Sequence, residues 1–440
     1  MVVLVVCGAL SGACINREVS EVQPRQSKEQ VLNVPVNLKS DIDILFVIDN
    51  SGSMREEQAS LVQNFGRFIN VLSTIEGLGL PNVHIGVVST NMGTGPFPIS
   101  GCAGGGDDGV LQNAPRQTGC SPPAGQFISD VSDGAGGRAT NYTGDLADTF
   151  SCIAELGISG CGFEQPLQAM RRALDGSNTQ NAGFLRPDAL LGIVFITDED
   201  DCSTENTQMF DTSQDSIDDP LGELGGHRCF EFGVACDPDT PRQTGVKDGC
   251  VPRENSEYMY GVQEYIDFVR DLKPDERDIV VAGIIGPPTP VIVGTNDDGR
   301  LEVEPTCEAS GGVAAPAVRL QAFLDGFVQT SSSTICNNDL SDALTLIAEL
   351  MARAAGNPCL DGNIAQPLQC EVSEVLDFQE TQIPRCDDDV GEAADNQPCH
   401  LIFEDPMWCG GYPSQLAVKV YPEERTVPTG TRLIVRCLAV

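Results

Sequence analysis

Short apolar runs bounded by turn residues alternate with amphipathic stretches from residue 41 to about residue 355. Each run is short enough to form a strand buried on both faces, and each stretch repeats its apolar residues with the period of a helix. The expected strands are 42–48, 83–90, 190–197 and 278–285, and the expected helices are 61–75, 161–175, 256–272, 320–327 and 340–351. This alternation predicts an α/β fold with a doubly wound, mostly parallel sheet over residues 41–357.

Two stretches rich in Gly, Asp and Pro, residues 91–150 and 202–255, interrupt this alternation and carry several cysteines. Structureless loops of this length are uncommon in a compact domain unless they are stapled or functional. We therefore expect two Cys-rich insertions, the first closed by a Cys102–Cys120 disulfide.

The pattern changes again after Gly356. Residues 358–440 contain six cysteines and few helix signals, and strand character is evident at 416–421 and 433–437. We predict a small disulfide-rich β module here, either independent or packed on the first domain.

The first 14 residues form a short apolar segment that ends in small residues, too short to span a membrane as a helix. Its end, Leu10-Ser11-Gly12-Ala13-Cys14, resembles a loose lipobox of bacterial lipoproteins, which implies a lipid anchor at Cys14. The alternative is an ordinary cleaved signal peptide. Residues 15–40 are polar and predict a linker. Both alternatives place the protein outside the cytoplasm, at the cell envelope or secreted.

Composition agrees with such a location. The chain of 440 residues has 26 basic and 64 acidic residues, a formal net charge of −38, which argues against binding nucleic acid or anionic membranes. There are 18 cysteines but only three histidines and no repeated CxxC spacing, so disulfides are favoured over structural zinc. Setting aside Cys7 and Cys14 leaves enough cysteines for eight bridges.

Candidate chemistry lies where two expected strands end. The strand 42–48 runs into Asp49-Asn50-Ser51-Gly52-Ser53, which places a carboxylate and two hydroxyls at alternate positions of a turn. Such hard oxygens suit Mg²⁺, Mn²⁺ or Ca²⁺. Asp198 ends the strand 190–197, and the carboxyl ends of parallel strands gather ligands, so Asp49 and Asp198 should meet around a cation. The alternative is that Asp49 and Ser51 merely cap the following helix.

The pattern Asp49-x-Ser51-x-Ser53, between a buried strand and an amphipathic helix, resembles the first ligand loop of von Willebrand factor A (vWA) domains. In that family it opens a metal-ion-dependent adhesion site, and a strand ending in Thr-Asp supplies the third loop, as Thr197-Asp198 does here. The resemblance covers roughly three-quarters of the chain.

The second ligand loop departs from the family, which supplies a threonine where this chain has Cys161. We expect Cys161 to pair with Cys152, which leaves Glu164 to replace the threonine, directly or through water. The alternative role for Glu164 is a helix-start acid favoured by the helix dipole. Asp200 and Asp201, beyond the third loop, are expected to be solvated.

The resemblance implies a binding protein whose cation leaves one position open for an acidic group of a protein partner, as in adhesion or recognition. Neutral hydroxyls neutralise the ion less than carboxylates would, so it stays electrophilic towards that group. An enzyme is not expected, because HExxH, GxSxG, Walker and Rossmann motifs are absent from the sequence. A metal-assisted hydrolase would also want a positioned base. The mismatched second loop keeps open a structural envelope protein with a vestigial metal site.

Overall fold

The structure is a computed structural model that describes thirteen segments of the chain. The segment 1–14, with Cys14 and the expected lipid anchor, lies outside the described residues. The described segments are 29–35, 41–73, 80–102, 104–115, 119–309, 312–355, 359–360, 362–376, 379–387, 397–406, 409, 413–421 and 432–439.

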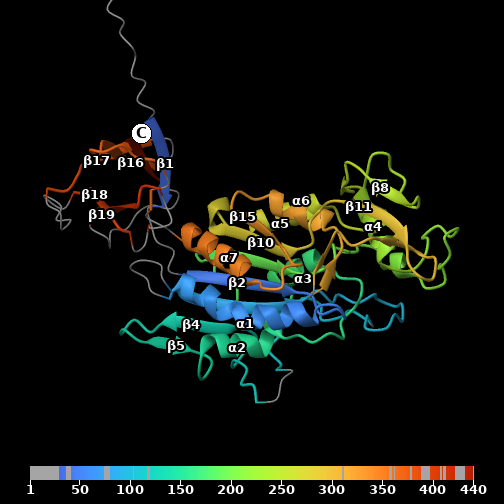
Figure 1. The fold of residues 1–440 in the computed structure, drawn as a ribbon. Coiled ribbons are helices and arrows are strands. Elements are labelled where there is room, and N and C mark those ends of the chain that lie inside the picture. The colour runs from blue at the N-terminus through green and yellow to red at the C-terminus, as the bar shows by residue number, and fades with distance from the viewer. Residues whose placement is uncertain are drawn as a thin grey trace, which may run out of the picture.

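A seven-stranded sheet forms the centre of the molecule (Figure 1). In spatial order its strands are β15 (Thr330–Thr334), β10 (Ile279–Ile285), β6 (Leu190–Ile196), β2 (Asp41–Ile48), β3 (Asn82–Ser89), β4 (Ile128–Ser132) and β5 (Arg138–Thr140). The first five strands are parallel, and β4 and β5 continue the sheet antiparallel. Every residue of β6 and β10 is buried, which explains why their sequences lack polar alternation.

Helices cover both faces of this sheet. Successive residues of a strand point to opposite faces, so each central strand contributes to two cores. Phe46 of β2 packs into one core with α1 (Arg55–Leu72), α2 (Leu146–Ala154) and α7 (Ser341–Ala354). Val47 packs into the other core with α3 (Pro166–Leu174), α5 (Val262–Asp271) and α6 (Val318–Asp325). The structure thus confirms an α/β fold built on a mixed sheet in which parallel pairs predominate. Within the described residues no helix is long and apolar enough to cross a membrane.

One helix begins later than the sequence predicts. The stretch from 256 was expected to be helical, but α5 starts at Val262. The Ser256 hydroxyl accepts hydrogen bonds from the backbone amides of Tyr258 and Met259, at 3.2 Å each. This local turn competes with the helix for the same backbone groups.

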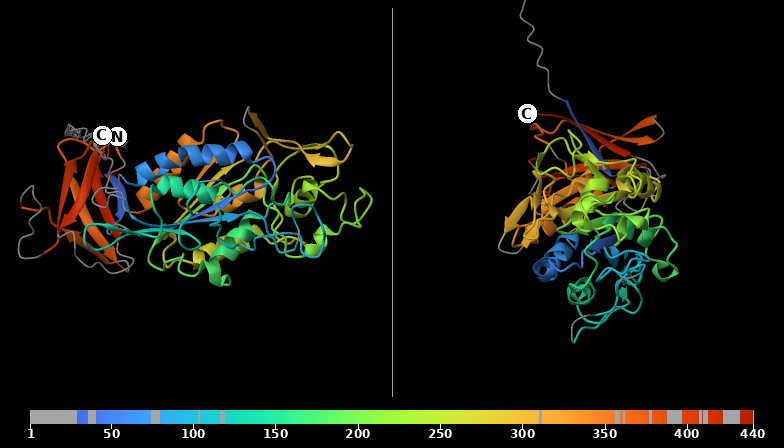
Figure 2. Two further views of the ribbon diagram at one scale, coloured as in Figure 1. Left: turned by 90° about the horizontal axis from the view of Figure 1, so that it is seen from below. Right: turned by 90° about the vertical axis from the view of Figure 1, so that its right-hand side faces the viewer.

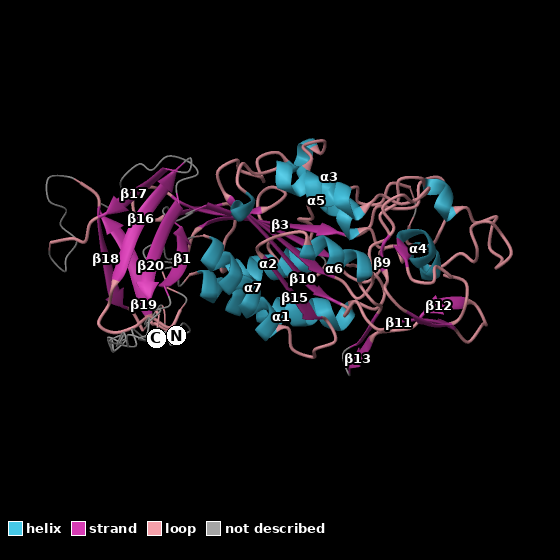
Figure 3. Ribbon diagram, turned by 90° about the horizontal axis from the view of Figure 1, so that it is seen from above, coloured by secondary structure: helices cyan, strands magenta, loops and turns pink. Residues whose placement is uncertain are grey.

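The second insertion forms a lobe beyond the carboxyl ends of the parallel strands (Figure 3). Its strand β8 pairs with β11, which follows β10 in the chain, so two separate segments build the lobe. The elements of this region are α4 (Gly226–Gly233), β7 (Val234–Ala235), β8 (Gly245–Lys247), β9 (Val251–Pro252), β11 (Val291–Thr295), β12 (Leu301–Val303), β13 (Cys307–Ala309) and β14 (Gly312–Ala314). Short 3₁₀ turns lie at Thr179–Asn181, Thr207–Phe210 and Glu276–Asp278.

Within the described residues eight disulfides link sixteen cysteines, as predicted, but both predicted pairings are wrong. Cys102 pairs with Cys161, and Cys120 pairs with Cys152. In these two bridges the paired cysteines are not those nearest in sequence. The first insertion returns to the sheet through β4 and β5 before α2 begins. The complete set is Cys102–Cys161, Cys120–Cys152, Cys202–Cys229, Cys236–Cys250, Cys307–Cys336, Cys359–Cys409, Cys370–Cys437 and Cys386–Cys399.

The C-terminal strands form a β module at the end of the molecule opposite the second insertion (Figures 1 and 2). One sheet has the order β1-β20-β16-β17, and β18 pairs with β19. Their bounds are β1 (Glu29–Pro35), β16 (Cys370–Leu376), β17 (Gln379–Ile383), β18 (Cys399–Glu404), β19 (Leu416–Tyr421) and β20 (Arg432–Leu438).

The module includes a strand from the other end of the chain. Residues 29–35, predicted as part of a linker, form β1 and pair antiparallel with β20 over seven residues. The linker prediction is therefore wrong for this segment. Leu32 packs against the core of the module, and β1 covers an edge of β20 that would otherwise expose unpaired backbone groups. The α/β unit is thus inserted between two strands of one sheet.

Candidate metal centre

The first predicted loop folds onto its own carboxylate. The Ser51 amide donates a hydrogen bond to Asp49 Oδ1 at 2.7 Å, and the hydroxyls of Ser51 and Ser53 lie 3.1 Å apart. The alternative that this loop caps a helix is wrong, because α1 begins after Met54 without any side-chain cap. The turn instead gathers oxygen atoms at the carboxyl end of β2.

Residues at the ends of the neighbouring strands β3 and β6 donate hydrogen bonds to the Asp49 carboxylate. This carboxylate is fully buried and accepts hydrogen bonds from the hydroxyls of Thr197 at 2.9 Å and Thr90 at 3.5 Å. The Gln58 side-chain amide donates to the Asp49 backbone carbonyl at 2.8 Å. Thr90 and Gln58 were not among the predicted site residues. The signal for Thr90 was present in the sequence, because it ends an apolar strand as Thr197 does.

Asp198 and Glu164 reach the same place from the third and second loops. Asp198 is 3% exposed, and its Oδ1 has no hydrogen-bond partner among the described residues. Glu164 is 5% exposed, and its backbone carbonyl accepts a hydrogen bond from the Cys202 amide at 2.8 Å. The sulfur of Cys161 is committed to Cys102, so this loop presents Glu164 as its oxygen donor.

These carboxylates perturb one another strongly. Burial, and then the charge of Asp198, raises the pKa of Asp49 to about 7. Burial and the charge of Asp49 raise the pKa of Glu164 well above its ordinary value, and burial also raises the pKa of Asp198. Burial also raises the pKa of Glu57, in the first turn of α1, to about 7. Among the described residues none of these four acids has an ion pair with a basic side chain.

A cavity of ≈ 480 Å³ opens above this cluster. Ser51, Ser53 and Glu164 line it from the sheet side, together with Glu199, the residue after Asp198. The opposite side is lined by residues of α4, in the second insertion, and of β12, in the segment that follows β10. Glu199 is exposed to solvent on the wall of this cavity. Three of the predicted ligands, Ser51, Ser53 and Glu164, therefore face this cavity, and Asp49 and Asp198 lie buried behind them.

The next residue of the third loop, Asp200, is half-buried, and the protein supplies hydrogen bonds to its carboxylate. It accepts hydrogen bonds from the backbone amides of Arg319 and Leu320 in the first turn of α6, at 3.0–3.1 Å. Burial is the main cause that raises its pKa, to about 6. The prediction that Asp200 is solvated is therefore wrong. Helix starts carry unsatisfied amides, and this carboxylate satisfies two of them.

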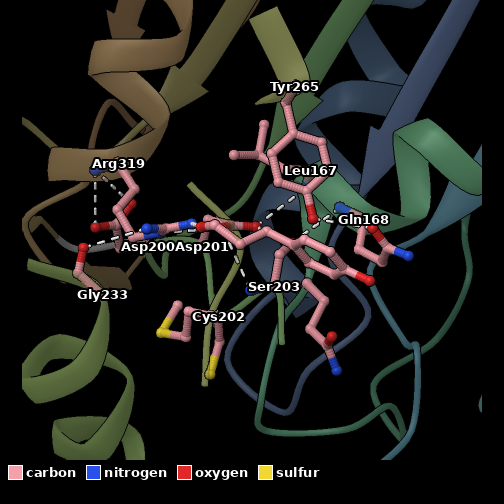
Figure 4. Close-up of polar contacts among 12 residues, drawn as sticks. Leu167, Gln168, Asp200, Asp201, Cys202, Ser203, Gly233, Tyr265 and Arg319 are labelled. Atoms are coloured by element: carbon pink, nitrogen blue, oxygen red, sulfur yellow. Dashed lines mark hydrogen bonds and ion pairs between the residues drawn. The ribbon is translucent and has the colours of Figure 1, made fainter. Parts of the chain in front are cut away.

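The prediction of a solvated Asp201 is also wrong, since it is 1% exposed and forms a buried ion pair with Arg319 at 3.0 Å (Figure 4). Asp201 Oδ1 accepts a hydrogen bond from the Leu167 amide at the start of α3, at 3.1 Å. Arg319 also donates to the carbonyls of Gly233 at 3.2 Å and Tyr260 at 2.8 Å. The loop that carries Asp198 is thereby braced against α3, α6 and the end of α4.

The candidate ligands offer oxygen atoms only, from carboxylates and hydroxyls. Across the described residues, no group of three or more His, Cys, Asp and Glu side chains is arranged as a complete metal site by itself. A site here would have to combine carboxylates with the hydroxyls of Ser51 and Ser53. Such an all-oxygen set fits Mg²⁺, Mn²⁺ or Ca²⁺, and the unpartnered Asp198 Oδ1 fits a ligand position.

Neither a protein-family model nor a curated protein matches the chain. Solved structures that resemble it include the pilus adhesin SpaC from Lactobacillus rhamnosus GG, at 12% identity and a TM-score of 0.32, over 93% of this chain and 41% of that one. The adhesive tip pilin GBS104 from Group B Streptococcus agalactiae matches at 10% identity and TM-score 0.29, over 93% of this chain and 81% of that one. The conserved hypothetical protein BatB from Bacteroides thetaiotaomicron matches at 12% identity and TM-score 0.27, over 71% and 98%. The chain spans about two fifths of SpaC, and at these scores the functional argument depends on the site alone.

Proposed function

We propose that this chain is an extracytoplasmic vWA-type binding protein with a doubly wound sheet and a metal-ion-dependent adhesion site. Asp49, Ser51, Ser53 and Asp198 hold a divalent cation, Mg²⁺ or alternatively Mn²⁺ or Ca²⁺, and Glu164 replaces the family's threonine. The cation keeps one position open towards the cavity. An acidic group on a protein partner fills it, which makes the activity cation-dependent adhesion or recognition rather than catalysis.

One observation carries this proposal. Asp198 Oδ1 is buried without a hydrogen-bond partner, beside a second buried carboxylate, Asp49. Leaving a buried carboxylate oxygen without a partner is costly, so such atoms are normally hydrogen-bonded or bound to metal. A divalent cation would supply the missing partner and relieve the repulsion between both carboxylates.

The location follows from the covalent structure. Eight disulfides are typical of a protein that folds in an oxidising compartment outside the cytoplasm. We propose the cell envelope, with a lipid anchor at Cys14, or secretion. The alternative of a structural envelope protein with a vestigial metal site is favoured by one observation, since Cys161 is tied to Cys102 and cannot stand in for the threonine.

Calorimetric titration of the purified protein with Mg²⁺, Mn²⁺ and Ca²⁺ tests the proposal. We expect the wild type to bind at least one ion, and Asp49→Asn to bind it more than about a hundredfold more weakly, because a direct ligand loses its charge. Asp148→Asn is the matched control, since Asp148 is exposed on α2 and does not line the cavity. Equal heats from the wild type and Asp49→Asn, or none from the wild type, would leave the vestigial alternative.

The second loop allows a sharper prediction. Breaking Cys102–Cys161 by a double Cys→Ser change frees the loop that carries Glu164, and we expect cation affinity to fall by about tenfold, as for other supports of metal ligands. Cys120–Cys152 ties the same insertion to α2 and lies outside the loop that carries Glu164. Breaking it in the same way should change affinity less than about twofold. Equal losses in the two double variants would show that the second loop has no special role in binding.

A further inference from the structure

The site lies at the floor of a walled cavity. The ≈ 480 Å³ space has the carboxyl ends of the parallel strands on one side and the lobe built from the second insertion and the segment after β10 on the other. The wall is fixed, because Cys202–Cys229 ties the third loop to α4, and Arg300 pairs with Asp215 while donating to the Leu224 carbonyl at 3.1 Å. A cavity of this size holds a few side chains and not a flat protein face. A partner must therefore insert a narrow segment to reach the floor.

The cavity wall carries negative charge beyond that of the proposed cation ligands. Glu199 and Glu302 both line it, and among the described residues neither has an ion pair with a basic side chain. Asp201 is paired with Arg319, and Arg300 is paired with Asp215. Asp200 and Glu223 also line the cavity, and their carboxylates accept backbone hydrogen bonds. A cation at the floor would leave the acids of the wall uncompensated.

The whole molecule reinforces this local charge. With a formal net charge of −38, the protein repels an acidic partner at long range, although its proposed cation requires an acidic group at contact. A partner can meet both conditions, attraction at long range and an acid at contact, only when the acid is a single group surrounded by basic side chains. Complementary charge around an interface mainly raises the association rate and the specificity.

We infer that the partner presents one Asp or Glu on a narrow segment in which basic side chains flank the acid. The acid completes the coordination of the cation, and the flanking Lys or Arg side chains face Glu199 and Glu302. This inference rests on the proposed cation site and adds the charge pattern of its ligand.

Heptapeptides of glycine and serine test the inference with the full chain and saturating Mg²⁺. One carries a central glutamate between two lysines, a second replaces the lysines by serine, and a third keeps the lysines but has glutamine at the centre. We expect the first to bind about tenfold more tightly than the second at low salt, by fluorescence anisotropy, and the third not to compete. At 0.5 M NaCl the difference between the first two should largely disappear, because salt screens exposed charges.

Variants assign the effect to the cavity. Glu302→Gln should reduce the preference for lysines by about threefold, whereas Asp148→Asn, which changes the net charge equally, should leave it intact. Equal binding of the first two peptides, or no peptide binding while calorimetry of the same sample records bound Mg²⁺, would overturn the inference and leave the cation site standing. Absence of Mg²⁺ binding would overturn the proposed function itself.

Discussion

Replacing Arg319 by methionine is expected to lower the free energy of unfolding of the α/β unit by about 3–5 kcal/mol, one of the largest effects of any single change in this protein. The guanidinium and the Asp201 carboxylate are both almost fully buried, 1% and 0% exposed as side chains. Methionine fills similar space but leaves Asp201 as an unpaired buried charge. It also leaves the carbonyls of Gly233 and Tyr260 without their donor.

Native-state hydrogen exchange at β6 and β10 measures this loss, because amides in the central strands report the most global opening of the unit. Arg353→Met is the matched control. Arg353 is half exposed and forms an ion pair with Glu349 one turn away on α7, so its loss should cost no more than about 0.5 kcal/mol. Similar losses in both variants would contradict the role assigned to the buried pair.

Stability should also fall steeply with pH when divalent cations are removed. Burial and Asp198 raise the pKa of Asp49 from 3.8 to about 7 in the folded protein. A raised carboxyl pKa contributes stability that is complete below the unfolded-state pKa and is lost as pH rises through the folded-state value. The loss therefore spans the range from about pH 4 to 7. The two units between pH 5 and 7 correspond to roughly 3 kcal/mol for this one group.

Scanning calorimetry in EDTA at pH 5 and pH 8 tests this expectation. The EDTA-treated protein should unfold roughly 5–10 °C lower at pH 8, and saturating Mg²⁺ should restore most of the difference by neutralising the same carboxylates. Asp49→Asn separates this site from general repulsion among the acids: its transition should depend less on pH and should not respond to Mg²⁺. A wild-type transition that Mg²⁺ leaves unchanged at pH 8 would argue against a cation at Asp49.

The central strands and the two carboxylate loops could be predicted because local sequence determines them. β2, β6 and β10 are covered on both faces, so their runs are almost wholly apolar. Asp49 and Asp198 follow such runs directly, and the parallel arrangement of β2 and β6 brings both to one edge of the sheet. Cation binding at that edge stays a prediction.

The remaining features depend on partners remote in sequence. Asp201 was expected to be solvated because its ion-pair partner, Arg319, is 118 residues further along the chain. The disulfide of Cys161 similarly reaches across 59 residues to Cys102. β1 has a short mixed sequence, EQVLNVP, and its pairing partner is β20, from the opposite end of the chain. No local pattern contains this information.

The pairing of β1 with β20 determines how the protein carries mechanical load. Under a pull between the chain ahead of Glu29 and a partner bound at Asp49, the load would pass along β1 and then along β2. The strands β16–β19 would lie outside that path. Since β2 lies between two parallel neighbours paired along nearly its whole length, a pull along its axis shears many hydrogen bonds at once instead of unzipping them singly. If a partner binds at this loop as proposed, the load would enter a strand that is hydrogen-bonded on both sides.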